Sequence, residues 1–227
     1  MKVFIDTAET KEIKKWVSYG VIDGVTTNPS IMVKCGVYDF DEGGKAIAKL
    51  AGKLPVSLEV TSNDLGEMFL QAKHLASLSP NIVVKIPVIN EFGEPTLGVV
   101  NKLEREEDIR VNVTAIMSFS QAVMAAKAGA TYISIFWGRI GDEGNNAGEI
   151  VSETAKFLQR WGMQNEIIVG SIRDVISVQQ AIQAGAHIIT IPPQFLVKMM
   201  DHKYTRDTVN MFVNDAKKAQ EQVSLGN

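Results

Sequence analysis

The chain has 227 residues, 45% of them hydrophobic and 22% charged, so it can bury a full core as one large or two small domains. A formal net charge of −3 gives no positive field to attract nucleic acid, and no nucleic-acid-binding motif is recognisable. The N-terminus does not resemble a signal peptide, because no apolar run follows the acidic Asp6. No apolar run elsewhere reaches the roughly 20 residues that a membrane helix needs. We therefore expect a cytoplasmic protein without membrane contacts.

Short apolar runs alternate along the chain with longer segments of helical periodicity. In the first helical segment, Ile13, Trp16 and Val17 recur at helical spacing, and Gly20 can end the helix. The short runs are rich in β-branched residues and are predicted strands: 3–7, 24–27, 56–60, 82–88, 111–116, 132–136, 166–172 and 187–191. The predicted helices are 7–20, a segment from Pro29, 64–78, 96–104, 118–128, 147–161, 175–184, 192–200 and 207–222.

The strict alternation of strand and helix predicts right-handed βαβ units and a parallel sheet. Eight such units favour a closed (β/α)₈ barrel, the TIM barrel, which typically has about 250 residues. The alternative is an open doubly wound sheet, but no GxGxxG follows the first strand. We therefore expect residues 1–227 to form a single barrel domain with an additional C-terminal helix at about 207–222.

Lys85 is the one charged residue in the apolar run IVVKIPV at 82–88. Burial of an ammonium without compensation is costly, so a buried lysine lowers its pKa instead. A neutral lysine is a nucleophile that forms a Schiff base with carbonyl carbons. The alternative is a lysine on an edge strand, or one whose tip reaches solvent.

Six of the other seven predicted strands also carry polar residues at or near their ends, and the active site of such a barrel lies at those ends. Asp6 and Glu59 are carboxylates that can move protons during Schiff-base chemistry, and Thr114 can hold a catalytic water or a substrate oxygen. The remaining polar groups suit a sugar phosphate: Asn28 for a hydroxyl, and Ser134, Arg139, Ser171 and Arg173 for the phosphate. Each residue alone has a structural alternative, such as an ion pair between Arg139 and Asp142.

Seven segments are spread over most of the chain: FIDTAE at 4–9, GVTTNPS at 24–30, VSLEV at 56–60, VVKIP at 83–87, NVTAIMSFSQAVMAAKAGATYIS at 112–134, FWGRI at 136–140 and GSIRD at 170–174. In this order they resemble the transaldolases, in particular the small subfamily that includes bacterial fructose-6-phosphate aldolase. The resemblance implies a (β/α)₈ barrel in which Lys85 forms the Schiff base and Asp6 is the acid–base for C–C cleavage.

The same resemblance implies further site residues. Glu59 and Thr114 would place the catalytic water, and Thr26 and Asn28 would contact the substrate. The phosphate would be surrounded by Ser134, Arg139, Ser171 and Arg173. No metal or organic cofactor is implied, because the lysine imine is itself the electron sink. The histidines, His74, His187 and His202, show no metal-ligand spacing.

Two positions bear on which reaction of the family is expected. Members that resemble transaldolases have Glu and Phe at the positions of Glu59 and Phe136, whereas fructose-6-phosphate aldolases have Gln and Tyr. A phenol can help to protonate the enamine and release free dihydroxyacetone, but Phe136 cannot. We therefore expect transfer of a dihydroxyacetone unit from fructose 6-phosphate to erythrose 4-phosphate. Release of free dihydroxyacetone and a non-catalytic sugar-phosphate-binding barrel are the alternatives.

The chain also departs from the family pattern. Ile135 replaces a proline and Trp137 a small apolar residue, and the indole between two predicted site residues can narrow the pocket. The resemblance further implies a homo-oligomer, a pentamer or decamer, assembled through the C-terminal helix. Its apolar residues Val209, Phe212 and Val213 fit a helix that packs either on this barrel or on a neighbour's.

Overall fold

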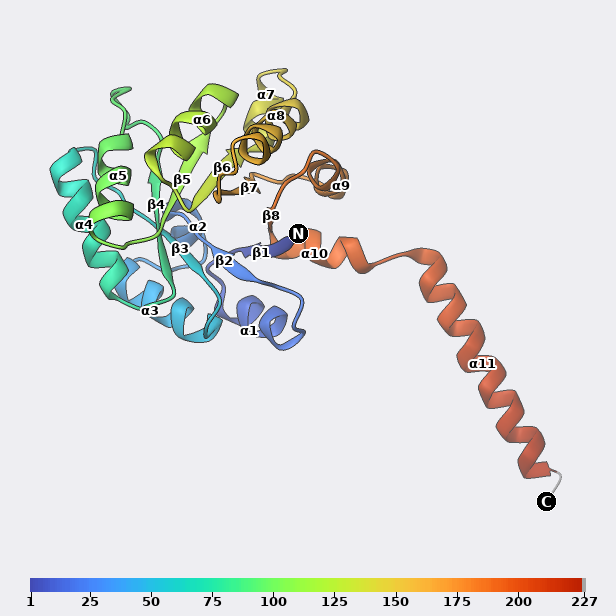
Figure 1. The fold of residues 1–227 in the computed structure, drawn as a ribbon. Helices are drawn as coiled ribbons and strands as arrows, with labels where there is room; N and C mark the ends of the chain where they lie inside the picture. Colours follow the sequence, from blue (N-terminus) through green and yellow to red (C-terminus); the bar gives the residue numbers. More distant parts are fainter. Residues whose placement is uncertain (226–227) are drawn as a thin grey trace. The chain divides into compact units, whose positions relative to one another are not determined.

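The computed structural model describes residues 1–225, in which eight parallel strands close into a barrel (Figure 1). The strands are β1 Lys2–Asp6, β2 Gly24–Thr26, β3 Val56–Glu59, β4 Ile82–Pro87, β5 Val111–Ile116, β6 Tyr132–Phe136, β7 Glu166–Gly170 and β8 Ile188–Ile191. Each strand pairs with the next in the chain, and β8 returns to β1 with Lys2 opposite Ile188. The predicted (β/α)₈ barrel is confirmed.

Helices form a ring around this barrel (Figure 1). They are α1 Thr10–Ser18, α2 Pro29–Lys34, α3 Phe40–Ala51, α4 Leu65–Ser77, α5 Leu97–Glu106, α6 Phe119–Ala128, α7 Trp137–Asp142, α8 Ala147–Arg160 and α9 Val175–Gln183. Side-chain caps begin several of them; for example, Asp64 accepts a hydrogen bond from the Glu67 amide, and Ser118 from the Gln121 amide.

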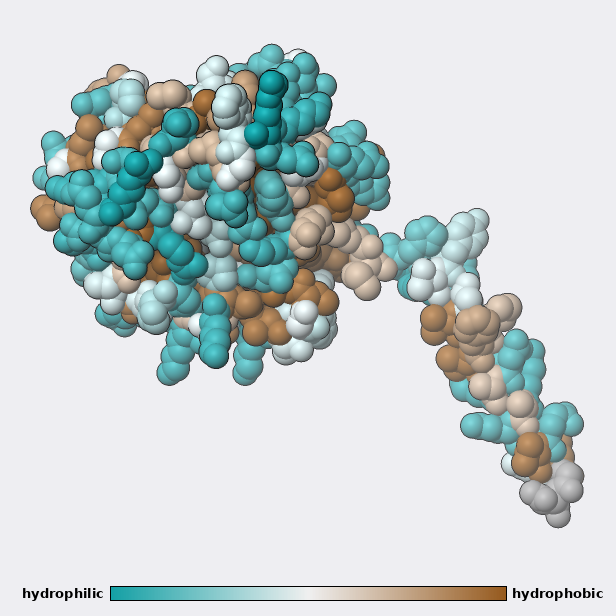
Figure 2. All heavy atoms as spheres, in the orientation of Figure 1, coloured by the Kyte–Doolittle hydropathy of each residue, from teal (hydrophilic) through white to brown (hydrophobic). Residues whose placement is uncertain are grey.

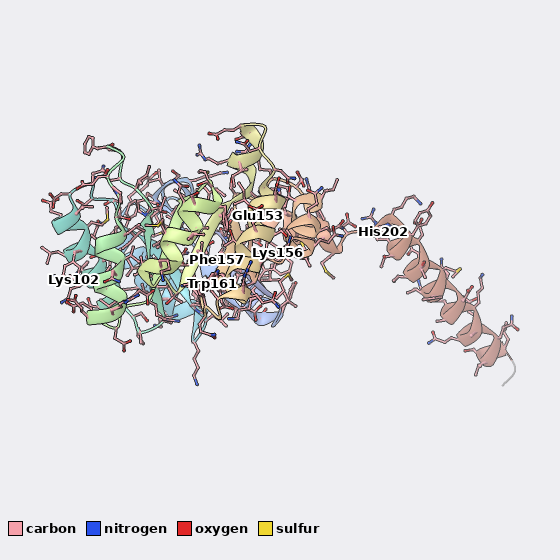
Figure 3. The ribbon with its side chains drawn as sticks, turned by 45° about the horizontal axis from the view of Figure 1, so that its top comes forward. Lys102, Glu153, Lys156, Phe157, Trp161 and His202 are labelled. Carbon is pink, nitrogen blue, oxygen red and sulfur yellow. The ribbon has the colours of Figure 1, made fainter. Side chains whose placement is uncertain are left out.

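The helix α8 illustrates why these segments fold against the barrel. Val151 and Leu158 are buried, whereas Glu153 and Lys156 are exposed and point away from the ribbon (Figure 3). An apolar stripe with helical spacing is buried only if it faces the strands. The result is a mainly hydrophilic outer surface on the visible face of the barrel (Figure 2).

A layer of apolar side chains fills the barrel below the C-terminal ends of the strands. It contains Phe4, Val83, Tyr132, Ile168 and Ile188, and the rings of Phe4 and Tyr132 meet edge to face at 6.0 Å. Phe4 and Val83 lie two residues before Asp6 and Lys85, so each pair points to the same side of its strand. The layer therefore forms an apolar floor beneath these two polar residues.

Substitution of Gly24 by alanine is expected to lower the free energy of unfolding by about 1–3 kcal/mol. A Cβ at Gly24 would stand 2.6 Å from two ring atoms of Phe4, and Phe4 is fully buried in the floor. Urea denaturation measures the effect. Gly98→Ala is the matched control, because nothing lies within 4 Å of a Cβ there. Equal stabilities of the two variants would contradict this account.

Two helices were not predicted from the sequence. In α3 the pair Gly43 and Gly44 weakens the helical pattern. Packing explains both glycines, because a Cβ at Gly43 would stand 2.2 Å from Val37 Cγ1 and a Cβ at Gly44 would stand 2.5 Å from Leu58 Cδ1. The other helix that was not predicted is α7, whose six residues are too few to show a helical period. The strand β7 also ends two residues earlier than predicted, because Ser171 adopts a positive φ of 58° and leaves the ladder.

The chain divides after Pro193 into two compact units, and the second unit begins at Gln194. It contains most of α10, Pro193–Met200, and all of α11, Lys203–Leu225, which begins four residues before the predicted helix 207–222 and ends three after it. Apolar side chains of α11 stand among polar ones along its visible face (Figure 2). Within residues 1–225, no helix is both long and apolar enough to cross a membrane.

Candidate functional site

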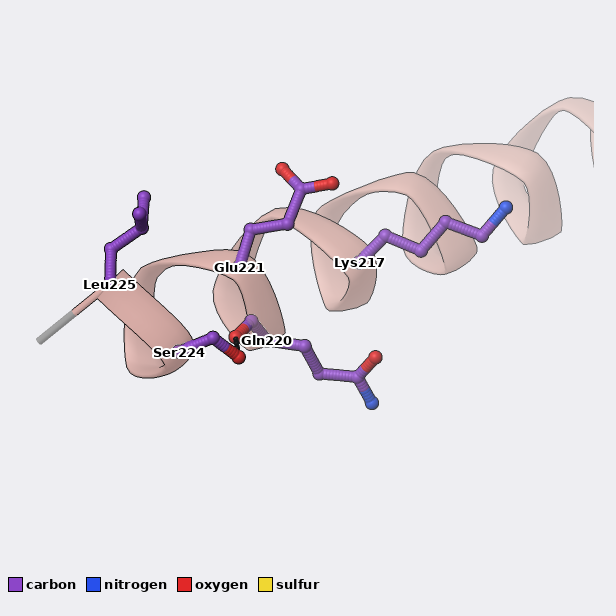
Figure 4. Close-up of a pocket in the computed structure, with 5 residues that line it drawn as sticks. All are labelled: Lys217, Gln220, Glu221, Ser224 and Leu225. Carbon is purple, nitrogen blue, oxygen red and sulfur yellow. Dashed lines mark hydrogen bonds between the residues drawn. The ribbon is translucent and has the colours of Figure 1, made fainter. Parts of the chain in front are cut away.

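A cavity of about 160 Å³ opens at the C-terminal ends of the strands. It is lined by Asp6, Thr26, Asn28, Lys85, Ser134, Phe136, Arg139, Gly170, Ser171 and Thr190. Eight of the eleven predicted site residues are in this lining; the other three are Glu59, Thr114 and Arg173. A second hollow, on α11 (Figure 4), is lined only by side chains of that one helix, so it brings no other element to a ligand.

Lys85 lies on β4 between Glu59 of β3 and Asn112 of β5 in the register of the barrel. Its side chain is 6% exposed, and its Nζ is 3.0 Å from Glu59 Oε2. The same nitrogen donates a hydrogen bond to the carbonyl oxygen of Thr27 at 3.1 Å. These contacts compensate the burial of a polar nitrogen and fix its position at the cavity wall. Phe136 presents its ring 5.9 Å from Nζ.

Asp6 is the last residue of β1 and faces the same cavity. Burial raises the pKa of its carboxyl; the charge of Lys85 and a hydrogen bond from Thr26 oppose this rise, and the charge of Glu59 adds to it. Thr26 Oγ1 donates to Asp6 Oδ1 at 2.7 Å. A carboxyl with a raised pKa can take up and return a proton near neutral pH more readily than an exposed one.

Thr190 of β8 is a lining residue that the sequence analysis missed. Its Oγ1 is 2.5 Å from Thr26 Oγ1, so it lies next to the hydroxyl that contacts Asp6. Threonine is a good strand former, and this one stands in an apolar strand, ITI, without another polar neighbour. The sequence feature that could have indicated Thr190 was its position near the end of a strand, because the other seven strands also carry polar residues at or near their ends.

Two buried polar atoms on β5 have no hydrogen-bond partner among the described residues: Thr114 Oγ1 and Asn112 Oδ1. The Asn112 amide nitrogen does donate to Ser57 Oγ at 3.1 Å. Native proteins pair nearly all such buried groups, with protein or with ordered water. Ala115, next to Thr114, has a positive φ of 57°, and the pairing of β5 with β6 shifts register here. Such irregularities are frequent beside active sites.

Asn28 has one of its two polar groups already committed. Its Oδ1 accepts a hydrogen bond from the Ile31 amide at 2.9 Å and caps α2. The side-chain NH₂ is the group left for a ligand. Asn28 can therefore donate to a hydroxyl oxygen in the cavity without rearrangement of the helix.

The predicted phosphate end of the cavity is only partly assembled. Ser134, Arg139 and Ser171 line the cavity, and the Gly138 amide donates to the carbonyl oxygen of Ser171 at 3.1 Å. Arg173 instead forms a two-pronged ion pair with Asp142, with Nη2 2.6 Å from Oδ2. Arg173 is the arginine that Asp142 pairs with, and the alternative of an Arg139–Asp142 pair is wrong.

Trp137 is adjacent to Phe136 in sequence but does not line the cavity. A Cβ at Gly148 of α8 would stand 3.4 Å from Trp137 Cη2, which places the indole beside the start of that helix. The departure from the family pattern at Trp137 therefore changes the packing of α7 on α8.

A family model described as transaldolase/fructose-6-phosphate aldolase matches residues 3–225. A probable transaldolase of Dehalococcoides mccartyi is 37% identical over 220 residues, covering 97% of this chain and 100% of the relative. A probable transaldolase of Petrotoga mobilis is 40% identical over 227 residues and covers both chains fully.

Solved structures with the same fold are more distant in sequence. The thiamine phosphate pyrophosphorylase of Pyrococcus furiosus aligns with a TM-score of 0.58 and 12% identity, over 84% of this chain and 85% of the other. Mandelate oxidase with benzoyl-formic acid gives a TM-score of 0.58 and 14% identity, over 85% of this chain and 64% of the other. At such identities the similarity is one of fold alone.

Proposed function

The chain belongs to the transaldolase/fructose-6-phosphate aldolase family, and we propose that it is a Schiff-base transaldolase with Lys85 as the covalent residue. The observation that carries this proposal is Lys85 in the cavity wall, with its Nζ 3.0 Å from Glu59 and the Asp6 carboxyl in the same cavity. Simple binding of a sugar phosphate needs neither a buried lysine nor an acid–base group.

In the proposed reaction the Lys85 amine attacks C2 of a ketose phosphate such as fructose 6-phosphate, and loss of water gives an imine. Asp6 then takes the proton of the C4 hydroxyl, the C3–C4 bond breaks, and the electron pair moves into the imine as an enamine. The first aldose phosphate leaves. The enamine attacks the aldehyde carbon of erythrose 4-phosphate, Asp6 returns its proton to the new hydroxyl, and water releases the product from Lys85.

Water must be removed and added at C2 during this cycle. We assign its placement to Glu59 and Thr114. The buried Thr114 hydroxyl has no partner among the described residues, and Glu59 already contacts Lys85 Nζ. The reaction requires no metal or organic cofactor, since the imine accepts the electrons. We propose that it takes place in the cytoplasm.

The remaining lining residues bind the substrate hydroxyls and the phosphate in this proposal. We assign a donor hydroxyl to the Asn28 amide and the phosphate to Ser134, Arg139 and Ser171. Arg173 joins the phosphate by exchanging its partner, Asp142, for the phosphate oxygens. Both groups of the Arg173–Asp142 pair are about half exposed, so the pair is weak enough to exchange.

Fructose 6-phosphate turnover is expected to be at least ten times faster with erythrose 4-phosphate present than without it. Phe136, which faces Lys85 Nζ, has no hydroxyl to help protonate the enamine, so the enamine accumulates until an acceptor arrives. Coupled assays for the released aldose phosphate and for free dihydroxyacetone measure the two outcomes. Equally fast turnover without acceptor would favour the aldolase alternative. Ligand binding without turnover or adduct would favour the non-catalytic barrel.

We also propose that the protein is a homo-oligomer, a pentamer or decamer, assembled through α11. Val209, Phe212 and Val213 are between 46% and 62% exposed, a cost that a covering surface would remove. Deletion of residues 205–227 is expected to reduce the mass measured by light scattering to that of a smaller assembly. The triple replacement of these three residues by serine keeps the helix and is expected to have the same effect. An unchanged mass in both variants would remove this role of α11.

A further inference from the structure

The hydroxyls of Thr190 and Thr26 form a buried chain that ends on the Asp6 carboxyl. Thr190 and Thr26 are 5% and 2% exposed, and they come from β8 and β2, the two strands that flank β1 in the closed barrel. The oxygen-to-oxygen distance is 2.5 Å from Thr190 to Thr26, and 2.7 Å from Thr26 to Asp6 Oδ1.

A count of hydrogens fixes the direction of this chain. A threonine hydroxyl has one hydrogen to donate and two lone pairs that accept. When Asp6 is ionised it can only accept, so Thr26 gives its hydrogen to Asp6 Oδ1. The contact between the two threonines must then be a donation from Thr190 to Thr26.

We infer that Thr190 is a positioning residue for Asp6, which acts through the hydroxyl of Thr26. A hydroxyl that accepts a hydrogen bond becomes a stronger donor, so Thr190 strengthens the bond that stabilises the Asp6 carboxylate. It also holds the Thr26 hydroxyl in the one rotamer that points at Asp6. The family resemblance implies that Thr26 contacts the substrate. With its hydrogen given to Asp6 and one lone pair taken by Thr190, its hydroxyl has one lone pair left and can only accept a hydrogen bond from a ligand.

The chain also responds to the proton on Asp6. When Asp6 carries a proton on Oδ1, it becomes the donor, Thr26 donates to Thr190, and the Thr190 hydrogen is free to point into the cavity. Both hydroxyls rotate, and no proton crosses between residues along the chain. When Asp6 is ionised, the Thr190 hydroxyl can therefore only accept a hydrogen bond from a group in the cavity. When Asp6 takes up a proton, the same hydroxyl can donate one.

Removal of the Thr190 hydroxyl is expected to raise the titration midpoint of Asp6 by about half a pH unit. The charged groups that face Asp6 are Lys85 of β4 and Glu59 of β3, and neither is changed. The midpoint is read by NMR of protein carrying ¹³C-carboxyl aspartate, with the Asp6 resonance identified by its loss in Asp6→Asn. Thr190→Val and Thr190→Ala both lack the hydroxyl, so either one tests the inference if the other fails to fold. Thr190→Ser keeps the hydroxyl and is expected to titrate as the wild type does.

A second comparison tests whether the effect passes through Thr26. In a Thr26→Val background, Thr190→Ala is expected to cause no further shift of the Asp6 midpoint. Three results would overturn the inference: an unmoved midpoint in the variants without the hydroxyl, an equal shift in Thr190→Ser, or an undiminished shift in the Thr26→Val background.

The consequence for turnover rests on the proposed transaldolase function. The low-pH limb of the kcat/KM profile is expected to move upward with the Asp6 midpoint in Thr190→Ala and to return in Thr190→Ser. Because the NMR titration needs no turnover, its outcome is separate from that function. A wild type without transfer activity would contradict the proposed function and leave the hydroxyl chain testable.

Discussion

Lys85→Met is expected to lower the proposed transaldolase turnover by more than about 10⁴-fold, since it removes the proposed covalent nucleophile, on which every step of the cycle would depend. Methionine has a similar length and no amine, so it fills the space of a side chain that is 6% exposed. Treatment of the wild type with fructose 6-phosphate and borohydride should add a reduced three-carbon unit to Lys85, identified by peptide mass spectrometry. The variant should gain no adduct.

The control is Lys127→Met, which removes an exposed lysine of α6 and should leave turnover and the Lys85 adduct unchanged. Circular dichroism should show that Lys85→Met is folded. Glu59 loses its partner in this variant but is itself 20% exposed on its side chain, so water can reach it. A folded wild type whose adduct lies on another lysine would refute the role of Lys85.

Gly138→Ala is expected to lower kcat/KM for fructose 6-phosphate by about 100-fold, the cost of a displacement near 1 Å in a substrate-binding group. A Cβ at Gly138 would stand 2.3 Å from the carbonyl oxygen of Ser171 and 2.7 Å from Arg173 Nε. Ser171 already has a positive φ, so its backbone has little freedom to relax. The substitution must therefore displace the segment that carries two predicted phosphate ligands.

Gly141→Ala is the matched control, because it lies in the same helix, α7, and an added Cβ there meets nothing within 4 Å. Steady-state kinetics with fructose 6-phosphate and with unphosphorylated fructose should separate the two variants. The loss in Gly138→Ala is expected to be largest with the phosphorylated donor. Equal kinetics of the two variants would show that Gly138 does not hold the phosphate end in place.

The sequence predicted most of the fold because each strand is a short apolar run bounded by helical periodicity. The barrel buries both faces of such strands, so a charged residue inside one of them stands out. This is why Lys85 could be predicted as a site residue. The two unpredicted helices, α3 and α7, lack a clear helical pattern in the sequence. Gly43 and Gly44 weaken a helical pattern, and six residues of α7 do not make one.

The site was less predictable where its geometry depends on contacts between distant strands. The pairing of Arg173 with Asp142 could not be chosen over an Arg139 pair from spacing, because both arginines are near Asp142 in the fold. Thr190 is an ordinary strand residue by type. Only the closure of β8 onto β1 brings its hydroxyl next to Thr26. The orphaned acceptor of Asn112 likewise appears only when its neighbours in the barrel are known.

The apolar floor of the barrel has a consequence for kinetics. Phe4, Val83, Ile168 and Ile188 fill the space below Asp6 and Lys85, so within the described barrel ligands reach the lysine from the C-terminal mouth. In the proposed transfer, donor, departing aldose and incoming aldose share that single route. The first product must then leave before the acceptor enters, which is a ping-pong order. Double-reciprocal plots at several acceptor concentrations should be parallel, and each aldose phosphate should compete with the other for the loaded enzyme.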